Sequence, residues 1–263
     1  MAPAHRPVGA APAWLAAESH TIESESGAKF AAWFTPVKDS RATIVLLHPL
    51  RGDRTAMLDR ARLLLNAQFS VLLVDLQAHG ESTGDHITAG HLEKFDAKAA
   101  VEFARRRNPN HKIGVLGWSL GGAAALLASP LQIDALAIES VYPTIEQAVE
   151  NRLKLRIGPS GQFFAPCLLW QLKPRFGISV SDLRPVDRIP FVHCPILIAS
   201  GGQDQHTTIA DTMKLVDAAK EPKTLVLFEH AQHEDLFRFD STKYEGTIVP
   251  FFVKHLQVSD PKQ

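Results

Sequence analysis

Short, almost wholly apolar runs alternate with amphipathic segments along most of this 263-residue chain. Runs rich in Val, Leu and Ile with few polar side chains are typical of strands that are buried on both faces of a sheet. Six such runs are present: Thr43–Leu47, Val71–Val74, Ile113–Leu116, Leu136–Ile138, Ile196–Ala199 and Leu225–Phe228. Stretches with helical spacing lie between or after them: Ala56–Asn66, His91–Arg106, Leu120–Ala128, Ile209–Ala219 and Tyr244–His255. The alternation predicts an α/β fold with a mostly parallel central sheet and helices on both faces.

Two segments depart from this alternation. Thr21–Glu25 and Lys29–Phe34 are strand-like and surround Ser26-Gly27, which predicts an N-terminal antiparallel hairpin at the edge of the sheet. The interval Tyr142–Arg188 is far longer than one crossover needs, and it is rich in aromatic residues, Pro and Gly. We expect a small helical lid there, with several of its apolar residues facing the substrate: Phe163, Phe164, Leu168, Leu169, Trp170 and Phe176.

The expected domain organisation is simple. Residues 1–19 are rich in Ala and Pro and are expected to form a loose N-terminal segment. Residues 20–263 are expected to form one domain, with the lid inserted at about 142–188.

Composition narrows the class of protein. The chain has 28 Lys and Arg against 28 Asp and Glu, so its net charge is zero and a nucleic-acid partner is not expected. Two cysteines outside any zinc-ligand spacing predict neither a disulfide framework nor a metal site. No run approaches the ~20 apolar residues of a membrane-spanning helix, and prolines interrupt the apolar N-terminus, so we expect a cytoplasmic protein.

The strongest local motif is Gly117-Trp118-Ser119-Leu120-Gly121. It begins where the apolar run Ile113–Leu116 ends, and an Ala-rich helical stretch follows it. A serine nucleophile on a sharp strand-to-helix turn needs small residues two positions before and after it, because the strand and the helix approach closely there. The motif and its context therefore predict that Ser119 is a catalytic nucleophile.

On these residues the chain resembles the α/β-hydrolase superfamily of serine hydrolases, from about residue 42 to the C-terminus. The family's oxyanion loop resembles His48-Pro49-Leu50-Arg51-Gly52, although Pro49 stands where a glycine is usual. Because proline has no N–H, the resemblance implies that the oxyanion donors are the backbone amides of Leu50 and Leu120. We expect His48 to brace this loop rather than to titrate in catalysis.

A second match is Asp75-Leu76-Gln77-Ala78-His79-Gly80-Glu81-Ser82, which resembles the superfamily's Asp-x-x-Gly-His-Gly-x-Ser turn with Ala78 in place of a glycine. Asp75 and His79 could be read as an acid and a base. They precede the nucleophile, however, and the family's order along the chain is serine, acid, histidine. We expect both to have a structural role.

The acid and the histidine follow the last two strands. Asp204 lies in the glycine-rich stretch after Ile196–Ala199, where the family presents its acid, and it could otherwise be a helix cap. Glu139, at the end of an earlier strand, is the alternative acid. His233 fits the loop that carries the catalytic histidine, with His230 as its alternative. The order Ser119, Asp204, His233 agrees with the family.

The resemblance is greatest to serine-aminopeptidase-like and monoacylglycerol-lipase-like members. It implies a serine hydrolase that cleaves a carboxylic ester or thioester of a small or medium hydrophobic acyl group through an acyl-enzyme intermediate, without a metal or another cofactor. A peptidase or aminopeptidase-like amide hydrolase is the alternative, and a non-catalytic ligand-binding member of the fold is a further one.

Overall fold

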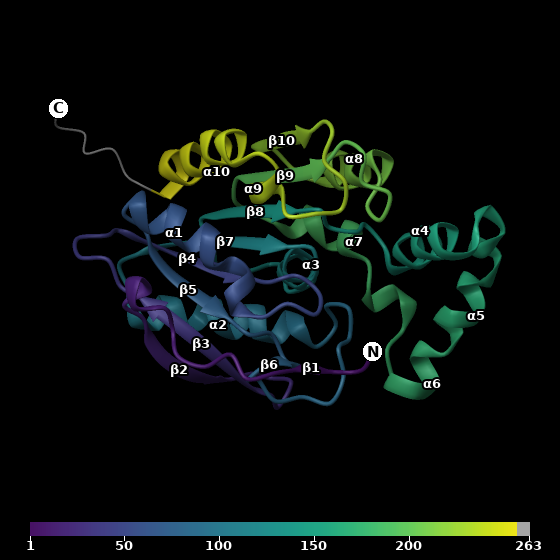
Figure 1. The fold of residues 1–263 in the computed structure, drawn as a ribbon, viewed down its shortest axis with the longest axis horizontal. Helices are drawn as coiled ribbons and strands as arrows, with labels where there is room; N and C mark the ends of the chain where they lie inside the picture. The colour runs from purple at the N-terminus through teal and green to yellow at the C-terminus, as the bar shows by residue number, and fades with distance from the viewer. Residues whose placement is uncertain (257–263) are drawn as a thin grey trace.

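The computed structural model describes residues 1–256 and contains an eight-stranded sheet in the order β10-β9-β8-β7-β4-β5-β3-β2 (Figure 1). Neighbouring strands from β10 to β5 pair in parallel, whereas β3 is antiparallel to both β5 and β2. The strands are β2 (Glu18–Glu23), β3 (Lys29–Thr35), β4 (Ala42–Leu47), β5 (Ser70–Val74), β7 (Lys112–Trp118), β8 (Ala135–Glu139), β9 (Ile196–Gly201) and β10 (Lys223–Phe228). The predicted mostly parallel sheet is confirmed.

Helices cover both faces of this sheet (Figure 1). The α-helices of the described residues, the lid helices included, are α1 (Leu58–Asn66), α2 (Glu93–Arg107), α3 (Leu120–Leu127), α4 (Ile145–Ile157), α5 (Ala165–Trp170), α6 (Leu172–Phe176), α7 (Pro185–Arg188), α8 (Ile209–Ala218), α9 (Leu236–Phe239) and α10 (Ser241–Leu256). No helix within residues 1–256 is long and apolar enough to cross a lipid bilayer.

Each face of the sheet has its own apolar core, because side chains alternate along a strand. In β4, Val45 and Leu47 join the core that contains α2 and α3, whereas Ile44 and Leu46 join the core that contains α1 and α10. All four side chains are fully buried. Burial on both faces of the sheet thus explains why these strands are apolar throughout their length.

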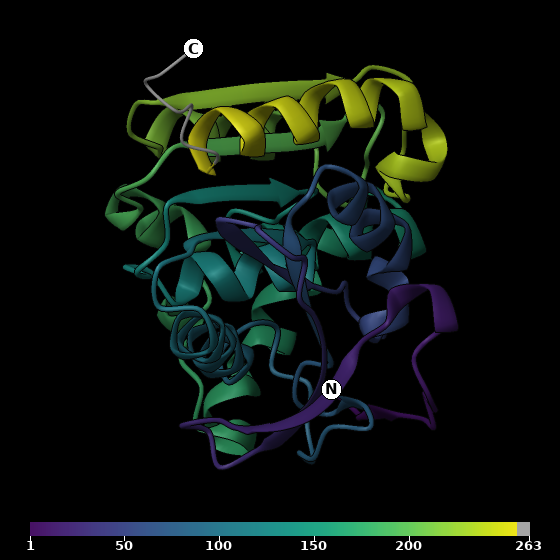
Figure 2. The ribbon, with the colours of Figure 1, turned by 90° about the vertical axis from the view of Figure 1, so that its left-hand side faces the viewer.

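The N-terminal hairpin forms one edge of the sheet, and β10 forms the other (Figure 2). The N-terminal segment, residues 1–19, contacts the rest of the domain at several points. Within it, β1 (Ala4–His5) pairs in parallel with β6 (His79–Gly80), and the side chain of Leu15 is fully buried. Thr35 Oγ1 donates a hydrogen bond to the Leu15 carbonyl, which fixes this segment to β3.

The long interval after β8 folds into short helices beyond the carboxyl ends of the strands (Figure 1). Helix α4 is capped by Thr144, whose hydroxyl accepts a hydrogen bond from the Gln147 N–H. The expectation for the lid aromatics is only partly met, because Phe163, Phe164 and Trp170 are 76%, 59% and 74% exposed. Their side chains lie on the outside of the lid.

Candidate active site

Ser119 occupies the turn between β7 and α3, and its backbone has φ 49° and ψ −105°. This conformation is strained for a residue with a side chain. The turn is tight on both sides. A Cβ at Gly117 would lie 2.5 Å from the Gly122 nitrogen, and one at Gly121 would lie 2.3 Å from the Leu47 carbonyl oxygen. Glycine at these positions is therefore a steric requirement of the predicted turn.

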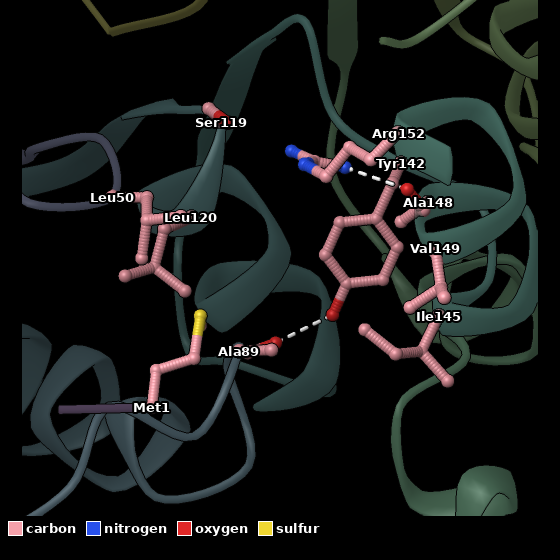
Figure 3. Close-up of a pocket in the computed structure, with 10 residues that line it drawn as sticks. All are labelled: Met1, Leu50, Ala89, Ser119, Leu120, Tyr142, Ile145, Ala148, Val149 and Arg152. Carbon is pink, nitrogen blue, oxygen red and sulfur yellow. Dashed lines mark hydrogen bonds between the residues drawn. The ribbon is translucent and has the colours of Figure 1, made fainter. Parts of the chain in front are cut away.

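Leu50 and Leu120 lie with Ser119 around one cavity (Figure 3). Within residues 1–256, neither the Leu50 N–H nor the Leu120 N–H donates a hydrogen bond to another protein group. Free backbone donors beside a nucleophile are what an oxyanion needs. The Pro49 carbonyl accepts hydrogen bonds from the Gly52 N–H and from the His48 ring, which shapes this loop.

His48 connects this loop to the strand end beside it. Its Nδ1 donates to the Pro49 carbonyl at 2.8 Å, and its Nε2 accepts from the Leu76 N–H at 2.9 Å. Complete burial, reinforced by the neighbouring His79, lowers the pKa of His48 to about 3. A neutral ring with both nitrogen atoms engaged agrees with the bracing role expected for it.

Asp204 and His233 lie in direct contact after β9 and β10. The Asp204 Oδ2 atom is 2.7 Å from His233 Nδ1. The same carboxylate accepts hydrogen bonds from the Thr207 hydroxyl and from the backbone N–H groups of His206 and Thr207. Burial alone would raise the pKa of Asp204, but hydrogen bonds from His233 and Thr207 hold it below its ordinary value. Asp204 therefore faces the imidazole as a carboxylate.

The two alternatives occupy other surroundings. Glu139 is fully buried and paired with Arg60, whose Nη2 lies 2.6 Å from Glu139 Oε2, and it also accepts a hydrogen bond from the Tyr244 hydroxyl. His230 is exposed in the turn after β10. Asp204 is the carboxylate that contacts His233, so it is the better-placed acid.

Asp75 and His79 lie in a buried turn and hold its backbone. Asp75 accepts hydrogen bonds from the N–H groups of Arg54 and Glu81 and from the Arg54 guanidinium. His79 Nδ1 donates to the Gln77 carbonyl at 2.8 Å. Both residues therefore make the contacts expected of a scaffold.

Ser119, Asp204 and His233 follow β7, β9 and β10 at the carboxyl edge of the sheet, the usual position of sites in open α/β sheets. Strand β8 lies between β7 and β9, and β10 follows β9. The Ser119 hydroxyl makes no hydrogen bond to His233 or to any other group in the described residues.

The cavity beside Ser119 is mostly apolar and opens to solvent (Figure 3). Its volume is about 520 Å³. A second cavity of about 560 Å³ continues beneath the lid and shares Met1, Ala89, Ile145 and Val149 with the first. Lid residues Leu168, Leu169, Leu172 and Phe176 line this second cavity. Because they share lining residues the two cavities adjoin, and together they are called the apolar channel below. Among the residues lining them, none is a carboxylate.

In the part of the chain that the structure describes, no group of three or more His, Cys, Asp or Glu side chains is arranged to hold an ion.

Comparisons with known proteins agree with this architecture. A family model described as serine aminopeptidase, S33, matches residues 38–145. The esterase Pf2001 of Pyrococcus furiosus superimposes with a TM-score of 0.78 at 21% identity, covering 97% of this chain and 99% of that one. The α/β hydrolase GrgF from Penicillium sp. sh18 gives a TM-score of 0.72 at 18% identity, covering 93% of this chain and 100% of that chain.

Curated relatives are similar over most of their length. Protein YfhR of Salmonella typhimurium is 27% identical over 253 residues, which is 92% of this chain and 82% of that protein. Protein YqkD of Bacillus subtilis is 23% identical over 236 residues, which is 88% of this chain and 77% of that protein.

The sheet order and the strand-to-helix turn at Ser119 are those of an α/β hydrolase. Together with the matched structures, they give this chain the α/β-hydrolase fold, as its motifs predicted.

Two arginines near the site were not anticipated from the sequence. Arg60, on α1, is fully buried and contacts Glu139 and Asp235, and its guanidinium lies 4.6 Å from the centre of the Trp118 ring. Arg152, on α4, lines the cavity of Ser119. Basic residues on helices normally face solvent, so only tertiary packing identifies these two.

Proposed function

We propose that this protein is a serine hydrolase that cleaves a carboxylic ester or thioester bearing a hydrophobic acyl group. The observation that supports the proposal is the Asp204–His233 contact of 2.7 Å, taken together with a strained Ser119 turn that lines an apolar cavity. A serine hydroxyl is a weak nucleophile until a neighbouring imidazole accepts its proton, so this pair supplies what the serine lacks.

In the reaction, Ser119 Oγ attacks the acyl carbonyl carbon while His233 Nε2 takes the hydroxyl proton. The carbonyl oxygen becomes an oxyanion that accepts hydrogen bonds from the Leu50 and Leu120 amides. His233 then returns the proton to the departing alcohol or thiol, which leaves an acyl-serine. Water, activated by the same imidazole, attacks this ester and releases the carboxylic acid and free Ser119. Asp204 holds the ring and stabilises its protonated form.

The cavity lining favours an acyl substrate over an aminopeptidase substrate. An aminopeptidase must bind the ammonium group of the substrate's N-terminus, for which an acidic side chain is the ordinary partner. The lining of both cavities is apolar apart from Ser119, Thr88, Tyr142 and Arg152, and its single cationic side chain would repel an ammonium group. Amide hydrolysis nevertheless remains the second candidate, because the matched family model is described as a serine aminopeptidase.

A panel of 4-nitrophenyl esters, from acetate to dodecanoate, tests the proposal beside aminoacyl 4-nitroanilides. We expect ester hydrolysis with the highest kcat/KM at a medium chain length, because the apolar channel has a finite volume. Ser119→Ala should abolish it, with circular dichroism showing that the fold is kept. Hydrolysis of the anilides in preference to every ester would favour the peptidase, and hydrolysis of neither by folded protein would contradict the proposal.

A further inference from the structure

One charged side chain faces the otherwise apolar cavity of the nucleophile. Arg152 projects from lid helix α4, and Figure 3 shows its guanidinium extending across the cavity towards Ser119. The other residues lining this cavity carry apolar or neutral polar side chains. A cation placed here influences which substrates enter.

The guanidinium of Arg152 has no anionic partner. Its Nη1 donates to the Ala148 carbonyl of the same helix at 2.9 Å, and no carboxylate within residues 1–256 lies within 4 Å of it. Of the other two partly buried lid arginines, Arg184 is paired with both Glu146 and Asp187, whereas Arg188 donates to the Ser129 carbonyl and lies over the Phe191 ring. Removing an unpaired cation from water costs free energy. An anion that binds from outside the chain would offset this cost for Arg152.

Burial lowers the pKa of Arg152, although the attraction of the more distant Asp204 carboxylate acts to raise it. That carboxylate is already engaged by His233, Thr207 and the His206 N–H. Most of the guanidinium's five donors therefore remain available.

The position of Arg152 is fixed by the residue before it. Asn151 Nδ2 donates to the His206 carbonyl at 3.2 Å and to the Asp211 carboxylate at 2.8 Å. These bonds attach α4 to the loop that presents Asp204. Arg152 is thus held on the acid and histidine side of the site, whereas the apolar channel runs the other way, past Ala89 and Ile145 to Leu169.

This placement distinguishes the two parts of the substrate. The histidine of a serine hydrolase gives its proton to the leaving group, so the leaving group lies on the histidine side. The acyl chain then occupies the channel beneath the lid. We propose that Arg152 binds an anionic group, a carboxylate or a phosphate, on the alcohol or thiol part of the substrate. This inference rests on the proposed function and names its substrate class.

Two esters that differ only by a carboxylate test the inference: 2-nitrophenyl octanoate and 4-nitro-3-(octanoyloxy)benzoate. We expect the ratio of kcat/KM for the anionic ester to that for the neutral ester to fall at least tenfold in Arg152→Gln, and to fall less in Arg152→Lys. Lys154→Gln, an exposed residue on the same helix, removes the same charge and should keep the wild-type ratio. Octanoyl esters of glycerol 3-phosphate and of glycerol repeat the comparison for phosphate.

A ratio that Arg152→Gln leaves unchanged for both pairs would overturn the inference, and so would a fall of equal size in Lys154→Gln. If wild-type protein hydrolyses none of the esters, the proposed function itself fails. Calorimetric binding of 4-nitro-3-(octanoyloxy)benzoate to Ser119→Ala, with and without Arg152→Gln, then decides the role of Arg152 separately. Binding at least tenfold weaker without the arginine supports it, and equal binding contradicts it.

Discussion

The carboxylate of Asp204 lies 2.7 Å from Nδ1 of His233, although 28 residues separate them along the chain. The contact exists because β9 and β10 are parallel neighbours whose carboxyl ends lie at the same edge, with Gly201 opposite Phe228. The imidazole is thereby held with Nδ1 towards the acid, which leaves Nε2 for the nucleophile.

Replacing Asp204 by Asn should keep the fold and remove the negative charge that holds this tautomer. We expect kcat for a 4-nitrophenyl ester to fall about a thousand- to ten-thousandfold. Asp217→Asn, at an exposed position on α8, is the matched control and should keep wild-type turnover. Near-normal turnover in Asp204→Asn would remove Asp204 from the mechanism and return attention to Glu139.

The buried ion pair of Arg60 and Glu139 connects residues that neighbour Ser119 and His233 in the chain. Arg60 also contacts Asp235, two residues after His233, and stacks on Trp118, the residue before Ser119. Arg60→Met would leave Glu139 buried without its cation, so we expect the free energy of unfolding in urea to fall by about 3 to 5 kcal/mol. Arg62→Met, on the same helix but exposed, should cost under ~1 kcal/mol. Equal effects of the two variants would show that the buried pair contributes nothing special.

Gly121 tests the steric account of the serine turn. A methyl group there would lie 2.3 Å from the Leu47 carbonyl oxygen. The backbone would have to move to relieve this clash. We expect Gly121→Ala to lower the free energy of unfolding by ~2 kcal/mol or more and to reduce kcat, since Ser119 moves with the turn.

At Gly246, in α10, nothing lies within 4 Å of an added Cβ, so Gly246→Ala should stabilise the protein by about 0.5 to 1 kcal/mol. A stable, fully active Gly121→Ala enzyme would refute the account.

Asp96, in the first turn of α2, predicts how stability depends on pH. Burial, with a contribution from Glu93, raises the pKa of Asp96 to about 7, although its Oδ2 accepts a hydrogen bond from the Gln77 N–H. Its Oδ1 is buried and has no partner in the described structure. In the unfolded chain an Asp titrates near 3.9, so folding favours the protonated form.

The sign follows from this difference. The stabilising contribution is complete below about pH 4 and is lost as the pH rises through about 7. Asp96→Asn should therefore have nearly wild-type stability at pH 4 and be more stable at pH 8, by up to ~4 kcal/mol. Urea titrations at the two pH values measure this. A difference between variant and wild type that does not grow with pH would contradict the expected protonation state.

Patterns confined to short segments predicted much of this molecule. The apolar runs fixed β4, β5, β7 and the strands beyond them, because burial on both faces leaves no polar position to obscure a strand. The Gly-x-Ser-x-Gly motif located the turn at Ser119 for a steric reason that Gly121 makes visible.

What sequence could not decide depends on packing between distant elements. Glu139 is the last residue of an apolar strand and Asp204 lies just after another, so only their partners, Arg60 and His233, distinguish them. In the sequence, Arg152 looks like any basic residue of a helix. The cavity that it lines forms only when α4 packs near Ser119. Phe163 and Trp170 have a composition suited to a pocket, yet they face outwards, since residues elsewhere on the lid already line the channel.

The central claim is that Ser119 is an activated nucleophile served by His233. Incubation with a fluorophosphonate, followed by intact-protein mass spectrometry, tests it directly, because this reagent phosphonylates a serine only when a neighbouring base has activated it. We predict one adduct per wild-type chain and no adduct on folded Ser119→Ala, with labelling strongly slowed in His233→Ala. An unlabelled wild-type protein, or an adduct that persists in Ser119→Ala, would contradict the account.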